Sequence, residues 1–217
     1  MYLRIILECE EEGLLPLSAR IVERLGRRAP TVHKTIYRMQ EHRLITIDER
    51  RHLLLTRTGR RQAVAVMRRH RLAELLLVDI LGVPYEQAHP EADRLQHALS
   101  DHVEQVIFRK LGYPIRSPYG NPIPGLTAIG GPPAPRRRPR SEIALTSATP
   151  GGTFVVDRLG EWVQTLLLAE LTAAGVVPGR VVTITHEPNA VIVSGVCVPE
   201  PLAHGIIVTA DPDPDRR

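Results

Sequence analysis

Proline is concentrated in one stretch of this chain, and that stretch limits what the chain can fold into. Eight of the nineteen prolines fall between Pro114 and Pro139. Because proline fixes φ and has no backbone N–H, such a stretch cannot form a helix or a central strand. The pattern predicts an extended linker with polyproline character over residues 113–141. It therefore divides the chain into two folded parts.

The composition excludes several classes of protein. Of the 217 residues, 43% are apolar and 24% are charged, as is typical of a globular protein. No apolar run approaches the roughly 20 residues that a membrane span needs, and the N-terminus does not read as a signal peptide. Cys9 and Cys197 are too far apart in sequence to suggest a disulfide framework or a zinc finger. We expect a cytoplasmic protein without a membrane contact.

The first 62 residues predict a winged helix-turn-helix domain. Hydrophobic spacing favours a helix over residues 2–12 that ends at Gly13, and a second helix over 18–25 with Ser18 as a possible N-cap. A third helix opens at Ala29-Pro30-Thr31, with an apolar face made of Val32, Ile36, Tyr37 and Met39. Short strands over 44–47 and 52–56 flank a charged turn. The order helix, tight turn, helix, wing is that of a DNA-binding unit.

The remainder predicts two further domains, and a mainly α protein overall. Residues 63–112 read as helical, with a long helix from Thr58 to Ile80 followed by helices over 86–99 and 101–111. In residues 142–212 short β-branched runs alternate with Gly and Pro, and one helix over 164–174 interrupts them. That pattern is typical of a small five-stranded barrel.

Basic charge is concentrated where the helix-turn-helix is predicted. Residues 20–61 contain twelve basic and four acidic residues, a net charge of +8 against +4 for the whole chain. An arbitrary basic run is more often a solvated surface, but its coincidence with this layout favours double-stranded DNA. The helix N-terminus and its outer face, together with flanking arginines, would meet the duplex. The candidate contacts are Arg27, Arg28, Thr31, His33, Lys34, Thr35 and Arg51.

Histidines and carboxylates recur at helical spacing in the predicted middle domain. His70 and Glu74 are four residues apart and share a helix face. A second group, H-x3-D-x2-Q-H, would bring Asp93, Gln96 and His97 together on one helix, with His89 one turn earlier. Imidazole nitrogen and carboxylate oxygen suit Fe(II), Mn(II), Co(II) or Ni(II). A histidine on a helix is also often an ordinary surface or core residue, so the spacing alone leaves both interpretations open.

Long motifs in this chain resemble the diphtheria-toxin-repressor family of iron- and manganese-dependent transcriptional regulators. The resemblance covers residues 1–126 and, more weakly, 143–210, where the family carries an SH3-like (FeoA-like) domain. It implies a homodimeric repressor that binds a palindromic operator when metal is bound. The motifs are MYLRIILECEEEG, SARIVERLGRRAPTVHKTIYRM, LTRTGRRQAVAVMRRHRLAELLLVDILGV, HPEADRLQHALSDHVE and SPYGNPIPGL.

The resemblance also implies two metal sites in each chain. The family's ancillary ligands fall on His70, Glu74 and His89, and its regulatory ligands fall on Met1, Asp93, Gln96 and His97. Asp93 stands where the iron branch has Cys, and Gln96 replaces Glu. The regulatory site thus carries less negative charge, which predicts weaker binding or a different ion. Met1 points to the iron branch, so Fe(II) is favoured and Mn(II) is the alternative.

The resemblance also concerns the SH3-like domain and the proline-rich segment. The family's SH3-like domain lends a Glu and a Gln to the ancillary site, which alignment puts at Gln164 and Leu167. Leu167 cannot ligate, so either Glu161 or Glu170 serves instead or the contribution is lost. The segment SPYGNPIPG is either docked on the SH3-like domain or an ordinary spacer.

The resemblance also leaves two questions about the DNA-binding end. The resemblance adds Pro30 to the candidate DNA contacts. The family has Ser-Gln where this chain has His33-Lys34, which leaves the operator sequence open. Family members also have a short segment before the position of Met1. Either the true start lies upstream, or the first helical turn is missing.

Together these observations favour a metal-dependent repressor that controls metal homeostasis genes. Metal that joins the helices would set the spacing of two recognition helices in a dimer. One alternative is a DNA-binding regulator of the same fold with weakened or lost metal control. Another is a metal-dependent hydrolase, but the chain has no H-E-x-x-H, phosphate loop or G-x-S-x-G motif. We expect neither an enzyme nor a small-molecule substrate.

Overall fold

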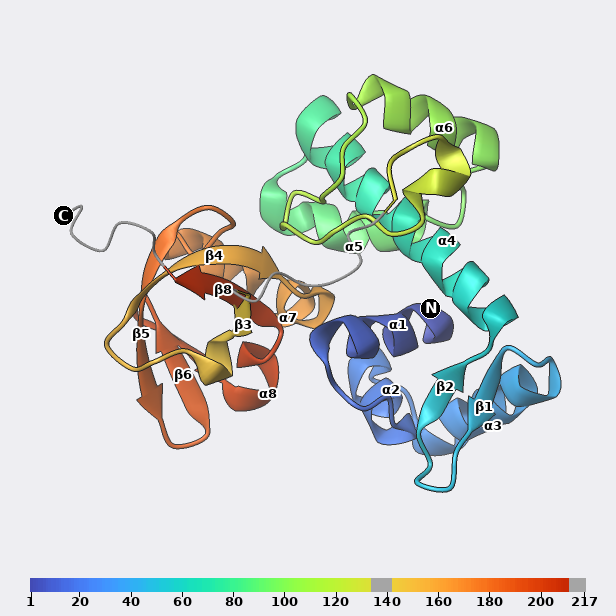
Figure 1. Cartoon of the computed structure of the whole chain (residues 1–217), viewed down its shortest axis with the longest axis horizontal. Coiled ribbons are helices and arrows are strands. Elements are labelled where there is room, and N and C mark those ends of the chain that lie inside the picture. The colour runs from blue at the N-terminus through green and yellow to red at the C-terminus, as the bar shows by residue number, and fades with distance from the viewer. Residues whose placement is uncertain (134–141, 211–217) are drawn as a thin grey trace. The chain divides into compact units, whose positions relative to one another are not determined.

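A computed structural model describes residues 1–133 and 142–210 of the chain (Figure 1). The chain forms two compact units, Met1–Arg68 and Arg69–Arg217, and each is described by itself. The finer division into domains at residues 62, 112 and 141 stays a prediction. No helix in the described part of the chain combines the length and the apolar character that crossing a membrane requires.

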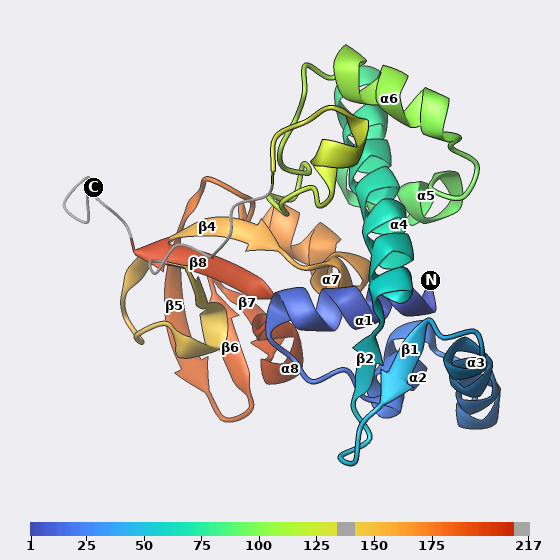
Figure 2. The ribbon, with the colours of Figure 1, turned by 45° about the vertical axis from the view of Figure 1, so that its right-hand side comes forward.

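The first unit is a winged helix-turn-helix, as predicted. Its core contains Ile6, Ile21, Val32 and Ile45, which are nearly inaccessible to solvent. The strands β1 and β2 pair antiparallel, with Ile45 opposite Leu55, and form the wing beside α3 (Figure 2). The elements are α1 (Tyr2–Glu12), α2 (Ser18–Leu25), α3 (Ala29–Glu41), β1 (Ile45–Ile47), β2 (Leu53–Leu55) and the start of α4 (Arg57–Leu75).

Three local expectations for this unit are wrong. Ser18 is the first residue of α2 rather than its N-cap, which is Leu17. Thr56, not Thr58, caps α4, because the Thr56 hydroxyl accepts the Gly59 N–H at 3.1 Å. Tyr37 is 61% exposed and does not belong to the apolar face of α3. That face is formed by the buried side chains Val32, Ile36 and Met39.

In the helical part of the second unit, the helices end earlier than predicted. The core of this part includes Leu72, Ala88, Ala92 and Phe108. Helix α5 stops at Leu95, so the residues after it lie in a turn and not on the helix. The Ser100 hydroxyl then accepts the Val103 N–H and starts the next helix. The elements are the end of α4, the π-helical turn η1 (Leu76–Ile80), α5 (Tyr85–Leu95) and α6 (Asp101–Lys110).

The rest of the second unit is an antiparallel sheet with two helices. Six strands are present in the described residues instead of the predicted five, in the order β3-β8-β4-β5-β6-β7. The main helix begins three residues earlier than predicted, at Glu161. The elements are β3 (Ile143–Ala144), η3 (Leu145–Ser147), β4 (Thr153–Leu159), α7 (Glu161–Ala173), β5 (Val181–Glu187), β6 (Ala190–Val193), β7 (Val196–Pro199), α8 (Glu200–Ala203) and β8 (Ile206–Ala210).

The described part of the proline-rich stretch, residues 113–133, is not an extended linker. A bridge between Arg116 and Pro122 closes a turn, and a 3-10 helix, η2 (Leu126–Ile129), follows. Tyr119 and Ile123 are buried. Apolar side chains between the prolines therefore make this stretch part of the fold. Residues 134–141 lie outside the described residues.

This turn packs against strand β4 of the sheet. The Leu159 N–H donates to the Tyr119 carbonyl at 2.9 Å, and the Asn121 side chain donates to the Leu159 carbonyl at 2.6 Å. Gly120 has φ 84° and approaches the strand so closely that a Cβ there would lie 2.1 Å from the Asp157 carbonyl oxygen. Of the two interpretations of SPYGNPIPG, the structure supports the docked one.

Candidate metal centre and nucleic-acid interface

Three ligand atoms converge in the interior of the second unit. His70 Nε2 lies 2.8 Å from Glu74 Oε1, and His89 Nδ1 lies 2.9 Å from the same oxygen. The two nitrogens are 3.2 Å apart. His70 and Glu74 share one face of α4 because they are one turn apart, and α5 supplies His89. All three side chains are almost completely buried.

The hydrogen bond of Thr165 determines which nitrogen of His89 carries the hydrogen. The Thr165 hydroxyl donates its single hydrogen to the Glu161 carbonyl at 2.9 Å. Its oxygen therefore accepts from His89 Nε2, which lies 3.3 Å away. A neutral His89 then has a lone pair on Nδ1, the nitrogen that faces Glu74.

Asp93 has the same effect on His70. His70 Nδ1 lies 3.3 Å from Asp93 Oδ1, and a carboxylate favours a proton on the nitrogen that faces it. His70 Nε2 is then left with a lone pair directed at Glu74 and His89. Three acceptor atoms that face one another in a buried site repel unless a proton or a cation lies among them.

The separations fit a first-row divalent metal. With metal–ligand bonds of about 2.1 Å, neighbouring ligand atoms lie about 3.0–3.4 Å apart in octahedral or tetrahedral geometry. The two nitrogens of His70 and His89 fall in that range, and their distances to Glu74 are slightly shorter. Two imidazoles and a carboxylate are ligands that Fe(II) and Mn(II) accept. The residues present therefore fit a metal ion.

The carboxyl group of Glu74 is ionised. When protons rather than a metal ion occupy the cluster, burial raises the Glu74 pKa, but the charge of His70 and the hydrogen bonds from His70 and His89 outweigh burial and hold the pKa at about 2. Its second oxygen, Oε2, is buried and has no hydrogen-bond partner in the described part of the chain. Glu74 thus offers a charge and a spare oxygen to a cation.

Helix α7, whose Thr165 contacts His89, also carries two buried polar side chains, Glu161 and Gln164. Glu161 is buried and pairs with Arg71, whose Nε and Nη2 lie 2.9 and 2.6 Å from Glu161 Oε1. Burial is the largest single cause and raises the pKa of the Glu161 carboxyl, but the charge and the hydrogen bond of Arg71, together with the charge of His70, outweigh it and lower the pKa. Gln164 Oε1 is buried and, among the described residues, has no hydrogen-bond partner.

The structure distinguishes the two glutamates that were alternatives on this helix. Glu161 lies one helical turn before Thr165, which contacts His89, whereas Glu170 is exposed. Glu161 is therefore the better placed of the two glutamates, and its role as a metal ligand stays a prediction.

The other predicted metal ligands are arranged differently. Gln96 donates its side-chain N–H groups to the backbone carbonyl of Asp93 at 2.9 Å and to its carboxylate at 3.2 Å. His97 is exposed in the turn after α5. Asp93 lies on α5 and Gln96 is its C-cap, whereas His97 lies beyond the end of the helix, so the predicted single helix carrying all three is too long. Met1 lies in the first unit, and its role as a ligand stays a prediction.

An alternative grouping also contains Asp93. One ligand atom each from His70, His89 and Asp93 can be chosen so that all three lie within 4.8 Å of one another. The grouping with Glu74 is tighter and completely buried, whereas the Asp93 side chain is 29% exposed.

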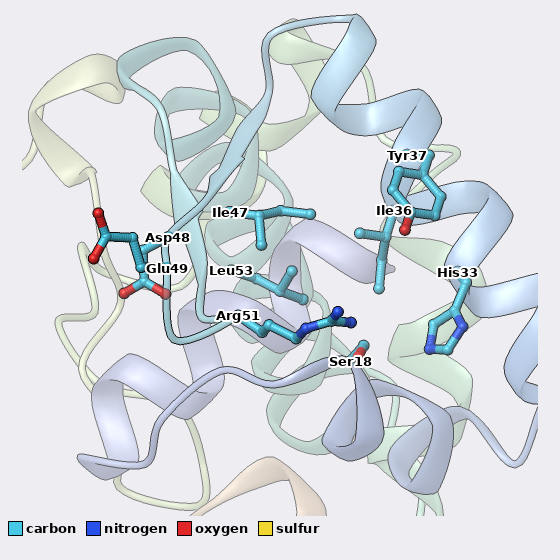
Figure 3. A pocket seen from close by; sticks show the side chains of 9 residues that line it. All are labelled: Ser18, His33, Ile36, Tyr37, Ile47, Asp48, Glu49, Arg51 and Leu53. Atoms are coloured by element: carbon cyan, nitrogen blue, oxygen red, sulfur yellow. The ribbon is translucent and has the colours of Figure 1, made fainter.

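In the first unit, the predicted DNA contacts are accessible to solvent. All are exposed except Thr35, which is half-buried and donates its hydroxyl to the Thr31 carbonyl at 3.0 Å. A groove of about 350 Å³ separates α3 from the wing, and Arg51 reaches into it opposite His33 (Figure 3). Tyr37 lines the same groove and was missed by sequence reasoning. Its spacing of four from His33 is the signal that could have found it.

Hydrogen bonds hold the tip of the wing in shape. Asp48 accepts the His52 N–H at 2.8 Å, and its other oxygen lies 2.8 Å from His52 Nδ1. The backbone hydrogen bond from His52 is the largest cause of a lowered Asp48 pKa. Arg51 adopts φ 63°, a left-handed conformation that closes this turn. The wing therefore presents Arg51 from a defined backbone.

Comparison with known proteins gives the family. A family model described as the iron-dependent repressor metal-binding and dimerisation domain matches residues 56–125. The iron-dependent repressor IdeR of Mycobacterium tuberculosis is 44% identical over 218 residues, which cover 96% of this chain and 95% of that protein. This chain belongs to the diphtheria toxin repressor family.

Further relatives agree with that membership. The diphtheria toxin repressor of Corynebacterium diphtheriae is 52% identical over 157 residues, covering 72% of this chain and 64% of that repressor. The IdeR structure from T. acidophilum aligns with a TM-score of 0.75 at 28% identity over 97% of this chain and 96% of its own. A manganese-dependent repressor in complex with manganese aligns with a TM-score of 0.77 at 30% identity, over 97% and 98%. The family resemblance is confirmed, and the family is one of transcriptional regulators and not of enzymes.

Proposed function

We propose that this chain is a metal-dependent transcriptional repressor that binds double-stranded DNA as a homodimer. The observation that carries the proposal is the convergence of His70 Nε2, His89 Nδ1 and Glu74 Oε1 in a buried site of a family of repressors. The site and the recognition surface lie on one chain, so metal and DNA binding can be coupled. DNA binding also places the protein in the cytoplasm.

The metal would be held by His70, Glu74 and His89, with Glu161 and Gln164 near enough in the fold to add oxygen ligands. A divalent cation there would supply a bond between α4 and α5. Fe(II) is the favoured ion and Mn(II) the alternative. The relatives support both, since one is named an iron-dependent repressor and another a manganese-dependent one.

The DNA would be met by the outer surface of α3 and the wing. This surface holds the exposed basic and polar residues and the positive end of α3. A homodimer would bind a palindromic operator with half-sites about one turn of DNA apart. The contact residues are Arg27, Arg28, Pro30, Thr31, His33, Lys34, Thr35 and Arg51, and Tyr37 joins them.

The test is a DNA-binding measurement with and without metal. Duplexes selected from a random pool with Mn(II)-loaded protein should share a two-fold symmetric sequence. Removing the metal with a chelator should raise the Kd for that duplex about 5–150-fold, the range of typical coupling free energies. Equal binding with and without chelator would contradict metal control.

Two variants and a control show which residues bind metal and which bind DNA. His89→Ala should remove the metal response and leave the weak metal-free binding. Lys34→Ala should weaken DNA binding in both conditions. His186→Ala, a change of the same kind at an exposed position on β5, should behave as the wild type. Anaerobic titration with Fe(II) and Mn(II) ranks the two ions.

A further inference from the structure

Asp93 and Gln96 are positions of the family's regulatory metal site, yet here they contact each other. The Gln96 amide nitrogen lies 2.9 Å from the Asp93 carbonyl oxygen and 3.2 Å from Asp93 Oδ1. Both neighbours are acceptors, so the group that faces them is the NH2 and not the amide oxygen. Gln96 is buried. The Gln96 amide NH2, a hydrogen-bond donor, therefore occupies the place where a cation would need oxygen ligands.

The carboxylate of Asp93 is also turned toward the other metal site. Asp93 Oδ1, the oxygen that accepts from Gln96, lies 3.3 Å from His70 Nδ1. The opposite nitrogen of that imidazole, Nε2, belongs to the convergent cluster with Glu74 and His89. A carboxylate behind a ligating imidazole is a recurrent arrangement that fixes the tautomer and makes the ligand more basic.

We propose that Asp93 is a positioning residue for the buried metal site and not a ligand of a second one. Gln96 holds the Asp93 carboxylate in place, Asp93 holds His70 with its hydrogen on Nδ1, and His70 Nε2 is then ready to bind metal. This inference rests on the proposed metal-dependent function and deepens it. The chain then binds one metal ion where the family pattern implies two.

The chemistry of the two side chains supports this assignment. A cation that used Asp93 Oδ1 would have to displace the Gln96 N–H and would lie within a few ångströms of the imidazole N–H of His70. Both of these groups are donors, which a cation does not tolerate in its coordination sphere. The neutral amide of Gln96 also adds no negative charge to offset that cost.

The test counts the metal ions bound by the full-length protein. Co(II) is the probe, because its visible absorption reports both the number bound and the ligand geometry. The wild type should bind one equivalent. Asp93→Asn should also bind one equivalent, with unchanged band positions and a Kd raised about 10–100-fold, the usual cost of losing an outer-shell partner. Glu91→Gln, an exposed change on the same helix, should bind as the wild type.

A second variant tests the role of Gln96. Gln96→Glu replaces the donor by a carboxylate and should create a second, weaker Co(II) equivalent. Two equivalents in the wild type, one of them lost in Asp93→Asn, would overturn this inference and leave the proposed function standing. An unchanged Kd in Asp93→Asn would overturn it as well. Absence of any Co(II) binding by the wild type would contradict the proposed function itself. The wild-type count needs no variant, so a folding defect cannot obscure it.

Discussion

Each unit of the chain buries a cluster of polar side chains, and the two clusters are built on opposite principles. In the first unit Arg4 Nε lies 2.8 Å from Glu8 Oε1, and Arg24 joins Glu8 at 3.2 Å and also Glu12. Cations and anions alternate there, and their side chains are almost fully buried. In the second unit His70, Glu74 and His89 present three acceptors to one another.

The difference shows how a structural cluster can be told from a binding site. Matched guanidinium and carboxylate charges offset each other and join α1 to α2. In the unmatched cluster of His70, Glu74 and His89, a proton or a cation has to lie among the facing nitrogen and oxygen atoms. Arg71 and Glu161 form a matched pair within the second unit, so burial alone does not distinguish the two kinds. The balance of donors and acceptors does.

The largest expected effect comes from unbalancing the matched cluster. Arg24→Leu leaves Glu8 and Glu12 buried without their shared guanidinium, and should lower the free energy of unfolding by about 3–5 kcal/mol. Urea unfolding followed by circular dichroism measures this. Arg27→Leu, at an exposed position, is the control and should change stability by less than about 0.5 kcal/mol. A loss of similar size in both variants would refute the comparison.

The unmatched cluster of His70, Glu74 and His89 should lose little stability when its acceptor Glu74 is replaced by a residue that can donate a hydrogen bond. In Glu74→Gln the amide can donate to an imidazole lone pair, so the metal-free protein should keep its stability to within about 1 kcal/mol. Metal stabilisation should disappear, which for the wild type is about 2.7 kcal/mol at a metal concentration of 100 times Kd. Thermal unfolding with and without Mn(II) checks both. Strong destabilisation of the metal-free variant would assign the cluster a structural role.

Acid should remove metal from the second unit before it disturbs the first. Glu74 has a pKa of about 2 and stays ionised, so protons compete for the imidazoles of His70 and His89. The apparent affinity for Mn(II) should therefore fall as the pH is lowered. Metal titrations at a series of pH values measure it. An affinity that does not change with pH would mean that imidazoles are not the ligands.

The smallest expected effect belongs to Thr165. Thr165→Val removes the oxygen that accepts from His89 Nε2, so the imidazole can take the wrong tautomer and the Kd for metal should rise about 10-fold. Thr172→Val on the same helix is the matched control, because no described residue hydrogen-bonds with the Thr172 hydroxyl. Equal Kd values for the two variants would exclude a role for Thr165 in orienting His89.

Much of the local structure could be predicted, and the errors share one cause. Pro30, the apolar spacing of Val32 and Ile36, and Gly13 were enough to place the helices of the first unit. The helix over 86–99 was drawn too long because its polar C-terminal residues fit helical spacing. Packing decided that α5 ends at Leu95 and that Gln96 turns back to Asp93.

The same contrast holds for the candidate site. The four-residue spacing of His70 and Glu74 was visible in the sequence, because one helical turn determines it. The pairing of Arg71 with Glu161 of α7 was not visible, because the two residues are 90 positions apart and meet only in the folded unit. The packing of Tyr119 against β4 was likewise not visible in the sequence, and the high proline content predicted a linker there.

By itself, the amino-acid sequence determined the winged helix-turn-helix, its basic surface and the helix that carries His70 and Glu74, since these depend on contacts within a few residues. Only the tertiary structure decided which acceptors meet, which imidazole nitrogen carries the hydrogen, and whether Asp93 faces a cation or His70. Those outcomes depend on hydrogen bonds between segments far apart in the chain, and no local pattern encodes where such segments meet.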